Sequence, residues 1–187
     1  MIAAAASFSR CTLVSAWRIL AVGSVLLCRA AAQDFAEYDV KAAFLSNFAE
    51  FVKWPAASFE GATSPIMIGV LGADPFGKVL PDLLRGKTVG GRSMSLKRSR
   101  TAADLQACQI VFISQSESAR LGDVLASFQG RPIVTVSDVS GFCTGGGVIS
   151  MVVTKGGKVG FEVNASAAKQ QGLQIKPNFL KLARKLY

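Results

Sequence analysis

Large apolar residues follow a helical period in the segment from Asp34 to Lys53. They recur at steps of three and four residues, which predicts an amphipathic helix with a core-facing stripe. The stripe consists of Val40, Phe44, Phe48, Phe51 and Val52. Acidic residues crowd the start of the segment and suit the positive end of a helix dipole. The helix is expected to end before Trp54-Pro55, because the residue preceding proline avoids helical geometry.

Three continuous apolar runs predict strands that are buried on both faces, as in a parallel sheet. They cover residues 65–71, 108–113 and 132–136, and turn residues bound each of them. Residues 93–97 alternate in polarity, so we expect a short exposed strand there.

Helical patterns separate these runs. After the first run, Asp74 is a good N-cap and Pro75 suits a first helical position, so a helix is expected over 75–84. One helical turn is expected at 102–105, and apolar spacing predicts a helix over 116–128.

The last forty residues begin with a hairpin pattern. Residues 148–154 and 158–163 flank Lys155-Gly156-Gly157, which predicts two antiparallel strands and a tight turn. Asn164 is expected to cap a short helix, and a final amphipathic helix is expected over 177–187.

Strands that alternate with helices are typical of the α/β class. The sequence therefore predicts a single domain over residues 33–187, with a mainly parallel sheet, helices on both faces and an antiparallel edge hairpin. No linker or internal repeat divides these residues.

Residues 1–32 resemble a secretory signal. Arg10 and Arg18 precede a short apolar stretch, and Ala30-Ala31-Ala32 offers small residues for cleavage after Ala32. The alternative is a membrane anchor, but about ten apolar residues are too few where a span takes about 20. A lipoprotein modified at Cys28 would require a small residue where Leu27 stands. We therefore expect an exported, periplasmic product that begins at Gln33.

Charge gives little support for nucleic-acid binding. Removing Arg10, Arg18 and Arg29 lowers the net charge from +9 to +6. The one dense basic run, Lys97-Arg98-Ser99-Arg100, has no interleaved aromatic residue, so a solvated loop or edge is the simpler interpretation. No nucleic-acid partner is expected.

The chain contains no histidine. This excludes Ser-His-Asp and Cys-His catalysis and any metal site that needs imidazole. We expect no metal, no cofactor and no enzymatic activity. Cys108 and Cys143 are the two cysteines after the leader. They are expected toward opposite ends of the sheet, beyond the 7 Å or so that a disulfide allows between Cα atoms, and hence as free thiols.

The ends of the predicted strands offer the candidate binding residues. The turn over 72–77 follows a strand and opens a helix, where open α/β sheets bind ligands, but it lacks a phosphate-loop pattern. Asp74 and Asp138 both fall at strand ends and could approach each other as an acid–base pair, although aspartate is a routine turn residue there. The plain interpretation of Gly145-Gly146-Gly147 is a flexible or positive-φ loop.

Five segments in register resemble the YfiR family. The first is Glu37 to Pro55 (EYDVKAAFLSNFAEFVKWP), and the second is Ile68 to Gly77 (IGVLGADPFG). The others are Cys108 to Ser114 (CQIVFIS), Pro132 to Gly147 (PIVTVSDVSGFCTGGG), and Val159 to Asn164 (VGFEVN) with the closing LKLAR. Together they span nearly all of the chain after the leader.

The resemblance implies a periplasmic regulator that dimerises and represses an inner-membrane diguanylate cyclase, restraining cyclic di-GMP and biofilm formation. A sensor histidine kinase is the other membrane partner to consider. The family's local disulfide near Cys143 lacks its second cysteine, because Ser150 and Met151 stand in that region. The alternative is a small-ligand module with a strand-end cleft formed by Asp74, Phe76, Asp138 and Phe142. A regulator predicts an exposed apolar patch, and a ligand module predicts a concave pocket.

Overall fold

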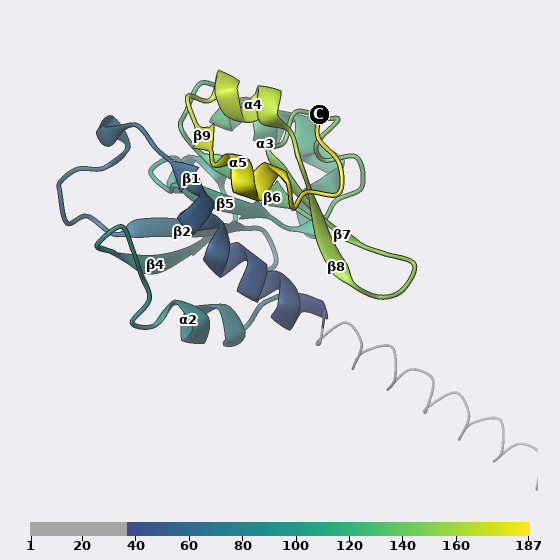
Figure 1. The fold of residues 1–187 in the computed structure, drawn as a ribbon, viewed down its shortest axis with the longest axis horizontal. Helices are drawn as coiled ribbons and strands as arrows, with labels where there is room; N and C mark the ends of the chain where they lie inside the picture. Colours follow the sequence, from purple (N-terminus) through teal and green to yellow (C-terminus); the bar gives the residue numbers. More distant parts are fainter. Residues whose placement is uncertain (1–36) are drawn as a thin grey trace, which may run out of the picture. The chain divides into compact units, whose positions relative to one another are not determined.

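The computed structural model describes residues 37–187, and a seven-stranded sheet organises them (Figure 1). The strand order is β3-β4-β2-β5-β6-β7-β8. The five central strands are parallel, and an antiparallel strand lies at each edge. The bounds are β2 (Ile66–Leu71), β3 (Thr88–Val89), β4 (Arg92–Ser99), β5 (Ile110–Ile113), β6 (Val134–Ser137), β7 (Ile149–Val153) and β8 (Val159–Val163).

The helices are short. The N-terminal helix is described over residues 37–48 and continues into the 3-10 turn η1 (Ala49–Phe51). The others are α2 (Val79–Leu84), α3 (Leu121–Phe128), α4 (Ala165–Gln170) and α5 (Pro177–Leu180). Further 3-10 turns are η2 (Ala56–Ser58), η3 (Ala102–Leu105) and η4 (Gln115–Arg120). Among residues 37–187, no helix has the length and apolar content needed to cross a membrane.

Side chains alternate between two apolar layers, one on each face of the sheet. In β5, Ile110 and Phe112 enter the layer formed with the N-terminal helix, α2, α4 and α5. Val111 and Ile113 enter the layer formed with η3 and α3. All four side chains are inaccessible to solvent. The predicted α/β class, mainly parallel sheet and edge hairpin are confirmed, and helices cover both faces.

An aromatic cluster joins the N-terminal helix to the C-terminal part of the chain. Phe48 contacts Phe161 of β8 and Phe179 of α5, with ring centroids 5.8 and 5.5 Å apart. Phe161 and Phe179 stack at 4.5 Å, and Phe51 stacks on Phe179 at 4.9 Å. Phe48 lies 113 residues before Phe161 and 131 residues before Phe179, so the cluster ties the two ends of the described chain together.

The predicted helix over 34–53 is too long at its C-terminal end. Its first residues lie outside the described part of the chain, but regular helix stops at residue 48. The two-residue strand β1 (Val52–Lys53) then pairs antiparallel with β9 (Gln174–Ile175), a pairing that the sequence pattern does not indicate. A strand of two residues has too short a pattern to recognise without its partner.

The helix expected over 75–84 begins only at Val79. Asp74 caps a local turn instead, because its Oδ1 accepts a hydrogen bond from the Phe76 N–H at 2.8 Å. Gly77 adopts φ +51°, a left-handed conformation that interrupts right-handed helix.

The final helix expected over 177–187 ends at Leu180. The tail then lies along the outer edge of β8. The Arg184 N–H donates to the Phe161 carbonyl at 2.9 Å, and the Val163 N–H donates to the Lys185 carbonyl at 3.0 Å. The backbone groups of the tail therefore form hydrogen bonds with the free edge of β8 instead of forming helix.

The strand expected over 93–97 is longer and more central than the pattern indicated. β4 runs from Arg92 to Ser99 and pairs in parallel with all six residues of β2. Met94 is buried, whereas several side chains of the strand stay partly or fully exposed. Hydrogen bonding to β2, which a single-sequence pattern does not encode, sets its length.

The loop before β7 offers a sharp packing test. A methyl group at Gly147 would overlap the buried Phe142 ring, whereas one at Gly145 would meet only carbonyl oxygens at an ordinary 3.6 Å. We expect Gly147→Ala to lower the free energy of unfolding by about 1–3 kcal/mol, the usual cost of overpacking. Gly145→Ala, with no clash and no positive φ, should change it by less than about 0.5 kcal/mol. Urea denaturation of both variants checks this, and equal effects would contradict the geometry.

Candidate functional site

A buried ion pair occupies the carboxyl end of β6. Asp138 Oδ2 lies 2.6 Å from the Lys41 ammonium and accepts a hydrogen bond from the Tyr38 hydroxyl at 2.9 Å. The side chains of Lys41 and Asp138 are only 4% and 5% exposed. Among the described residues, no donor reaches Asp138 Oδ1. The pair therefore anchors the N-terminal helix to the sheet through a desolvated charge contact.

Phe76 belongs to the core beside this ion pair. It is 3% exposed, and its ring packs edge-on against Phe112 at 4.7 Å and against Tyr38 at 5.9 Å. Tyr38 thus contacts both Phe76 and Asp138, so the structure brings together two of the four residues predicted for a cleft. Both are engaged in packing or an ion pair.

The other two predicted residues lie elsewhere. Asp74 faces Arg98 of β4, with Oδ2 and Nε 2.6 Å apart. Phe142 is completely buried in the layer on the opposite face of the sheet. Asp74 and Asp138 each have a basic partner of their own, which favours the interpretation of both as structural carboxylates.

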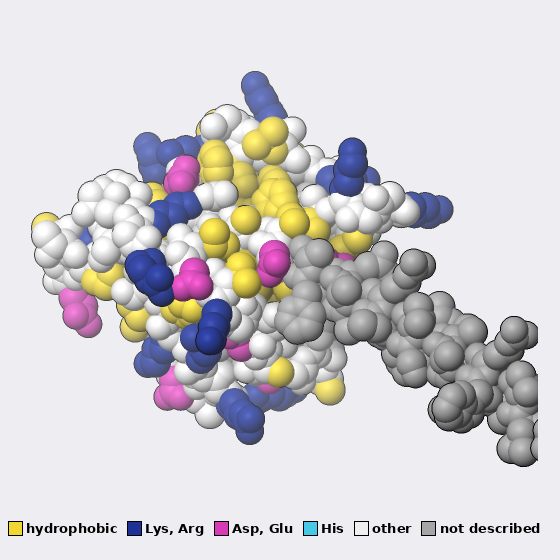
Figure 2. Space-filling view, turned by 90° about the horizontal axis from the view of Figure 1, so that it is seen from below, with side chains coloured by type: hydrophobic (Ala, Val, Ile, Leu, Met, Phe, Trp, Pro, Cys, Tyr) yellow, Lys and Arg dark blue, Asp and Glu magenta, His cyan; other side chains and the backbone are white. Residues whose placement is uncertain are grey.

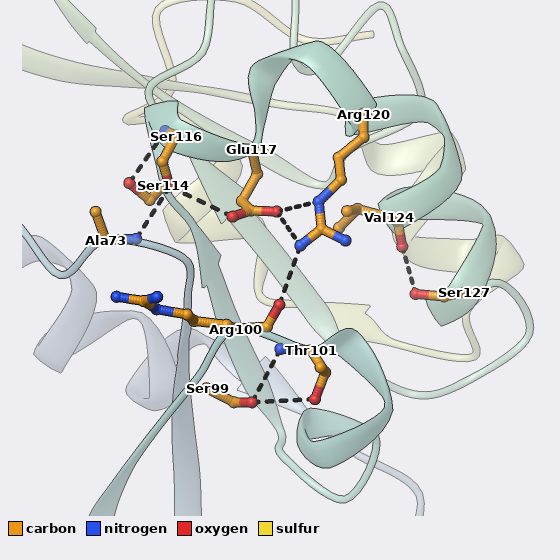
Figure 3. Close-up of polar contacts among 10 residues, drawn as sticks. All are labelled: Ala73, Ser99, Arg100, Thr101, Ser114, Ser116, Glu117, Arg120, Val124 and Ser127. Carbon is orange, nitrogen blue, oxygen red and sulfur yellow. Dashed lines mark hydrogen bonds and ion pairs between the residues drawn. The ribbon is translucent and has the colours of Figure 1, made fainter.

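A second set of polar contacts lies beyond the carboxyl ends of β2 and β5 (Figure 3). The Ala73 N–H donates to the Ser116 hydroxyl at 3.0 Å. Glu117, which is 6% exposed, binds Arg120, and the Arg120 guanidinium also donates to the Arg100 carbonyl at 3.0 Å. Glycine is required at position 72, because the backbone passes close to Ser116 and Glu117 and a methyl group there would overlap both side chains.

The sequence pointed to Asp138 but not to its partner Lys41, and the Glu117 cluster was not predicted, although two signals were present. Ser114 and Glu117 have the spacing of a capping box, and the Ser114 hydroxyl indeed accepts from the Ser116 N–H at 3.4 Å. Lys41 stands between apolar residues on the predicted helix, where a charge on a buried face requires a partner.

The stripe of the N-terminal helix is rotated from its predicted position. Val40 is 45% exposed, whereas Lys41 is 3% exposed. The buried face instead follows Ala42, Leu45 and Phe48. Pairing with Asp138 stabilises the buried ammonium, and the adjacent valine is left at the surface.

Both cysteines are buried free thiols in the described part of the chain. Burial raises the pKa of the Cys108 thiol and that of the Cys143 thiol to about 11. The Cys143 thiol contacts the Glu162 carbonyl oxygen at 3.6 Å and that of Val148 at 3.7 Å. Neither thiol has the lowered pKa that makes a cysteine reactive. Within residues 37–187, no cluster of acidic and sulfur ligands is arranged to hold a metal ion.

Hydrophobic side chains reach the surface where the N-terminal helix and the C-terminal segment meet. Val40 and Leu182 are 45% and 65% exposed, and Phe44 and Leu180 are partly buried. Phe44 of the N-terminal helix packs on Phe161, and Phe161 stacks on Phe179 of α5. The two segments are therefore joined through the Phe161 ring. Figure 2 shows hydrophobic side chains gathered on one face, bordered by charged ones. We use the name apolar face for the exposed or partly exposed hydrophobic residues of these two segments, Val40, Phe44, Leu180 and Leu182.

These features define an α/β protein whose buried polar groups hold the fold and whose surface carries an apolar patch. Comparison with known proteins is consistent with this description. The sequence matches the family model described as YfiR/HmsC-like over residues 38–184, so the chain belongs to that family. The family consists of periplasmic regulators of diguanylate cyclases, and its members are regulators and not enzymes.

The fold is also similar to a crystal structure of a conserved domain protein from Vibrio cholerae O1 biovar El Tor. The TM-score is 0.49 at 12% sequence identity. The similarity covers 65% of this chain and 55% of that chain, so this chain spans about half of that protein's length.

The Lys41–Asp138 contact makes a measurable prediction. Lys41→Met leaves a buried carboxylate unpaired and should lower the free energy of unfolding by about 3–5 kcal/mol. Arg85→Met removes an ion pair whose side chains are 79% and 58% exposed, and should cost less than about 1 kcal/mol. Denaturant unfolding of both variants checks the contrast. A small loss for Lys41→Met would contradict a buried pair.

The raised pKa values of the two thiols predict how the free energy of unfolding changes at alkaline pH. Because folding raises the pKa of each thiol from about 9 to about 11, the unfolded chain releases these protons first. Their contribution to stability is present below pH 9 and is lost as pH rises toward 11. Urea unfolding at about pH 8 and about pH 10.5 should therefore show a smaller loss for a Cys108→Ala/Cys143→Ala variant than for the original chain. Equal losses would show that the thiols are not desolvated.

Proposed function

We propose that this chain is exported, loses residues 1–32 by cleavage after Ala32, and binds the periplasmic domain of an inner-membrane signalling protein to hold it inactive. The partner is a diguanylate cyclase, so the chain restrains cyclic di-GMP synthesis and biofilm formation. The family match over residues 38–184 is the observation that carries the proposal. The leader lies outside the described residues, and its cleavage is part of the proposal.

The apolar face supports binding by surface contact. Soluble proteins rarely expose large contiguous apolar patches, and those that do use them for interaction. Phe44 and Leu180 pack against the buried core that contains the aromatic cluster, and Val40 and Leu182, in the same two segments, are 45% and 65% exposed. Rigid apolar side chains with exposed ends are suited to a protein interface, since little conformational entropy is lost on binding.

A homodimer is part of the same proposal, with the apolar face available either to a second copy or to the membrane partner. A sensor histidine kinase is the other partner to test. The predicted strand-end ligand cleft is less favoured, because Phe76 and Asp138 are occupied by Tyr38 and Lys41. Nucleic-acid binding by the basic run is not favoured either, because Arg98 of that run forms an ion pair with Asp74.

Crosslinking in intact cells tests the partner. A tagged copy expressed from its own promoter is expected to capture a membrane protein with a cytoplasmic cyclase domain. Deleting the gene should raise cyclic di-GMP. Capture of a kinase instead would redirect the partner assignment, and capture of the chain's own dimer alone under several growth conditions would contradict the membrane partner.

Substitution of the apolar face tests the surface. Leu182→Asp places a charge in the proposed contact and should weaken partner capture by about tenfold or more, since charges are depleted at interface cores. Leu83→Asp is the matched control, because Leu83 is 39% exposed on α2 and lies outside the apolar face. Quantified crosslinking yields, with circular dichroism to verify folding, decide the matter. Equal capture by both variants would exclude this surface.

A further inference from the structure

A separate cavity lies at the amino ends of the central strands, opposite the polar clusters. Its volume is about 530 Å³, within the range of small-molecule sites. Residues just before β2, β5 and β6 line it, together with the segment around η2. No part of the proposed regulatory surface uses this cavity.

The walls of the cavity are largely apolar and are held rigidly. Phe59, Met67, Pro132 and Ile133 provide ring, thioether and aliphatic surface. Gln109 fixes two walls together, because its Oε1 accepts from the Met67 N–H at 2.7 Å and its Nε2 donates to the Ser58 carbonyl at 2.8 Å. A preformed apolar cavity with few polar groups is the usual form of a ligand site.

The charges around the mouth favour an anion. Arg131 lines the cavity, and its guanidinium group makes no hydrogen bond or ion pair with another residue of the described chain. Arg92 lies over the Phe59 ring at 3.9 Å and donates to the Ser64 carbonyl at 2.7 Å. Glu60 also lines the cavity but does not pair with Arg131. Arg92 does not itself line the cavity, but its guanidinium group lies against the Phe59 wall, so this region carries two guanidinium groups and one carboxylate.

We propose that this cavity binds a small molecule with an apolar, ring-containing body and one anionic group. The body packs between Phe59, Met67 and Ile133, and the anion pairs with Arg131. This site is independent of the regulatory proposal, and its test contains no membrane partner.

A natural fluorescent reporter stands beside the cavity. Trp54 donates from its indole Nε1 to the Gln109 carbonyl at 3.2 Å, and its ring lies 6.5 Å from that of Phe59. The chain has two tryptophans, and the other, Trp17, is in the expected leader. In the product purified from the periplasm, Trp54 emission therefore reports on this region alone.

Two probes separate the apolar and ionic contributions. The probe 1-anilinonaphthalene-8-sulfonate has apolar rings and a sulfonate, and N-phenyl-1-naphthylamine has the same rings without the charge. Titration of the purified chain, followed through energy transfer from Trp54, should show saturable binding of both, with the sulfonate probe tighter. Added salt should weaken the sulfonate probe and leave the neutral probe unchanged, because salt screens an exposed cation.

Three substitutions test whether the probes bind in this cavity. Arg131→Gln should raise the Kd of the sulfonate probe by about five- to tenfold, as expected for loss of a charge-assisted contact, and leave the neutral probe unchanged. Ala107→Phe, at an exposed position in the cavity wall, should weaken both probes. Arg85→Gln, the same change on exposed α2, should alter neither. Absence of binding by the original chain, or binding of the sulfonate probe that is unaffected by Arg131→Gln, would overturn the proposal.

Discussion

The central constraint on this fold is that β5 and β6 are buried on both faces. Every residue of these two strands is inaccessible to solvent, so the chain must supply an apolar layer above and below them. The N-terminal helix and the distant α5 provide much of one layer, because Phe48 packs edge-on against Phe161 of β8 and Phe179 stacks on the same ring. α3 and the Phe142 loop supply the other. The positions of both chain segments follow from this requirement.

The same requirement explains which features could be predicted from sequence. The apolar runs of β2, β5 and β6 are continuous, so a pattern alone identifies them as two-sided strands. Asn164 caps α4 as expected, its side chain accepting from the Ala167 N–H at 2.8 Å. The rotation of the N-terminal helix could not be predicted, since burial of Lys41 depends on Asp138, which is 97 residues away.

The two ends of the parallel sheet differ in chemistry. At the carboxyl ends, Asp138 and Glu117 are neutralised by Lys41 and Arg120, and the space around them is occupied. At the amino ends, Gln109 joins two walls of a cavity, and the Arg131 side chain has no partner within the described residues. The prediction placed candidate ligand residues at the carboxyl ends, where open α/β sheets usually bind. Side chains from the N-terminal helix, whose packing no local pattern encodes, occupy that position here.

The tail along β8 has a consequence for the behaviour of the protein in a crowded compartment. A strand at the edge of a sheet presents unpaired backbone groups that can recruit a strand from another chain. Here the Tyr187 N–H donates to the Val163 carbonyl at 3.0 Å, and the Tyr187 carbonyl accepts from Ala165 at 3.1 Å. The last residues therefore block strand-by-strand growth at the β8 edge, and association of copies through this side of the sheet must use side chains instead of backbone pairing.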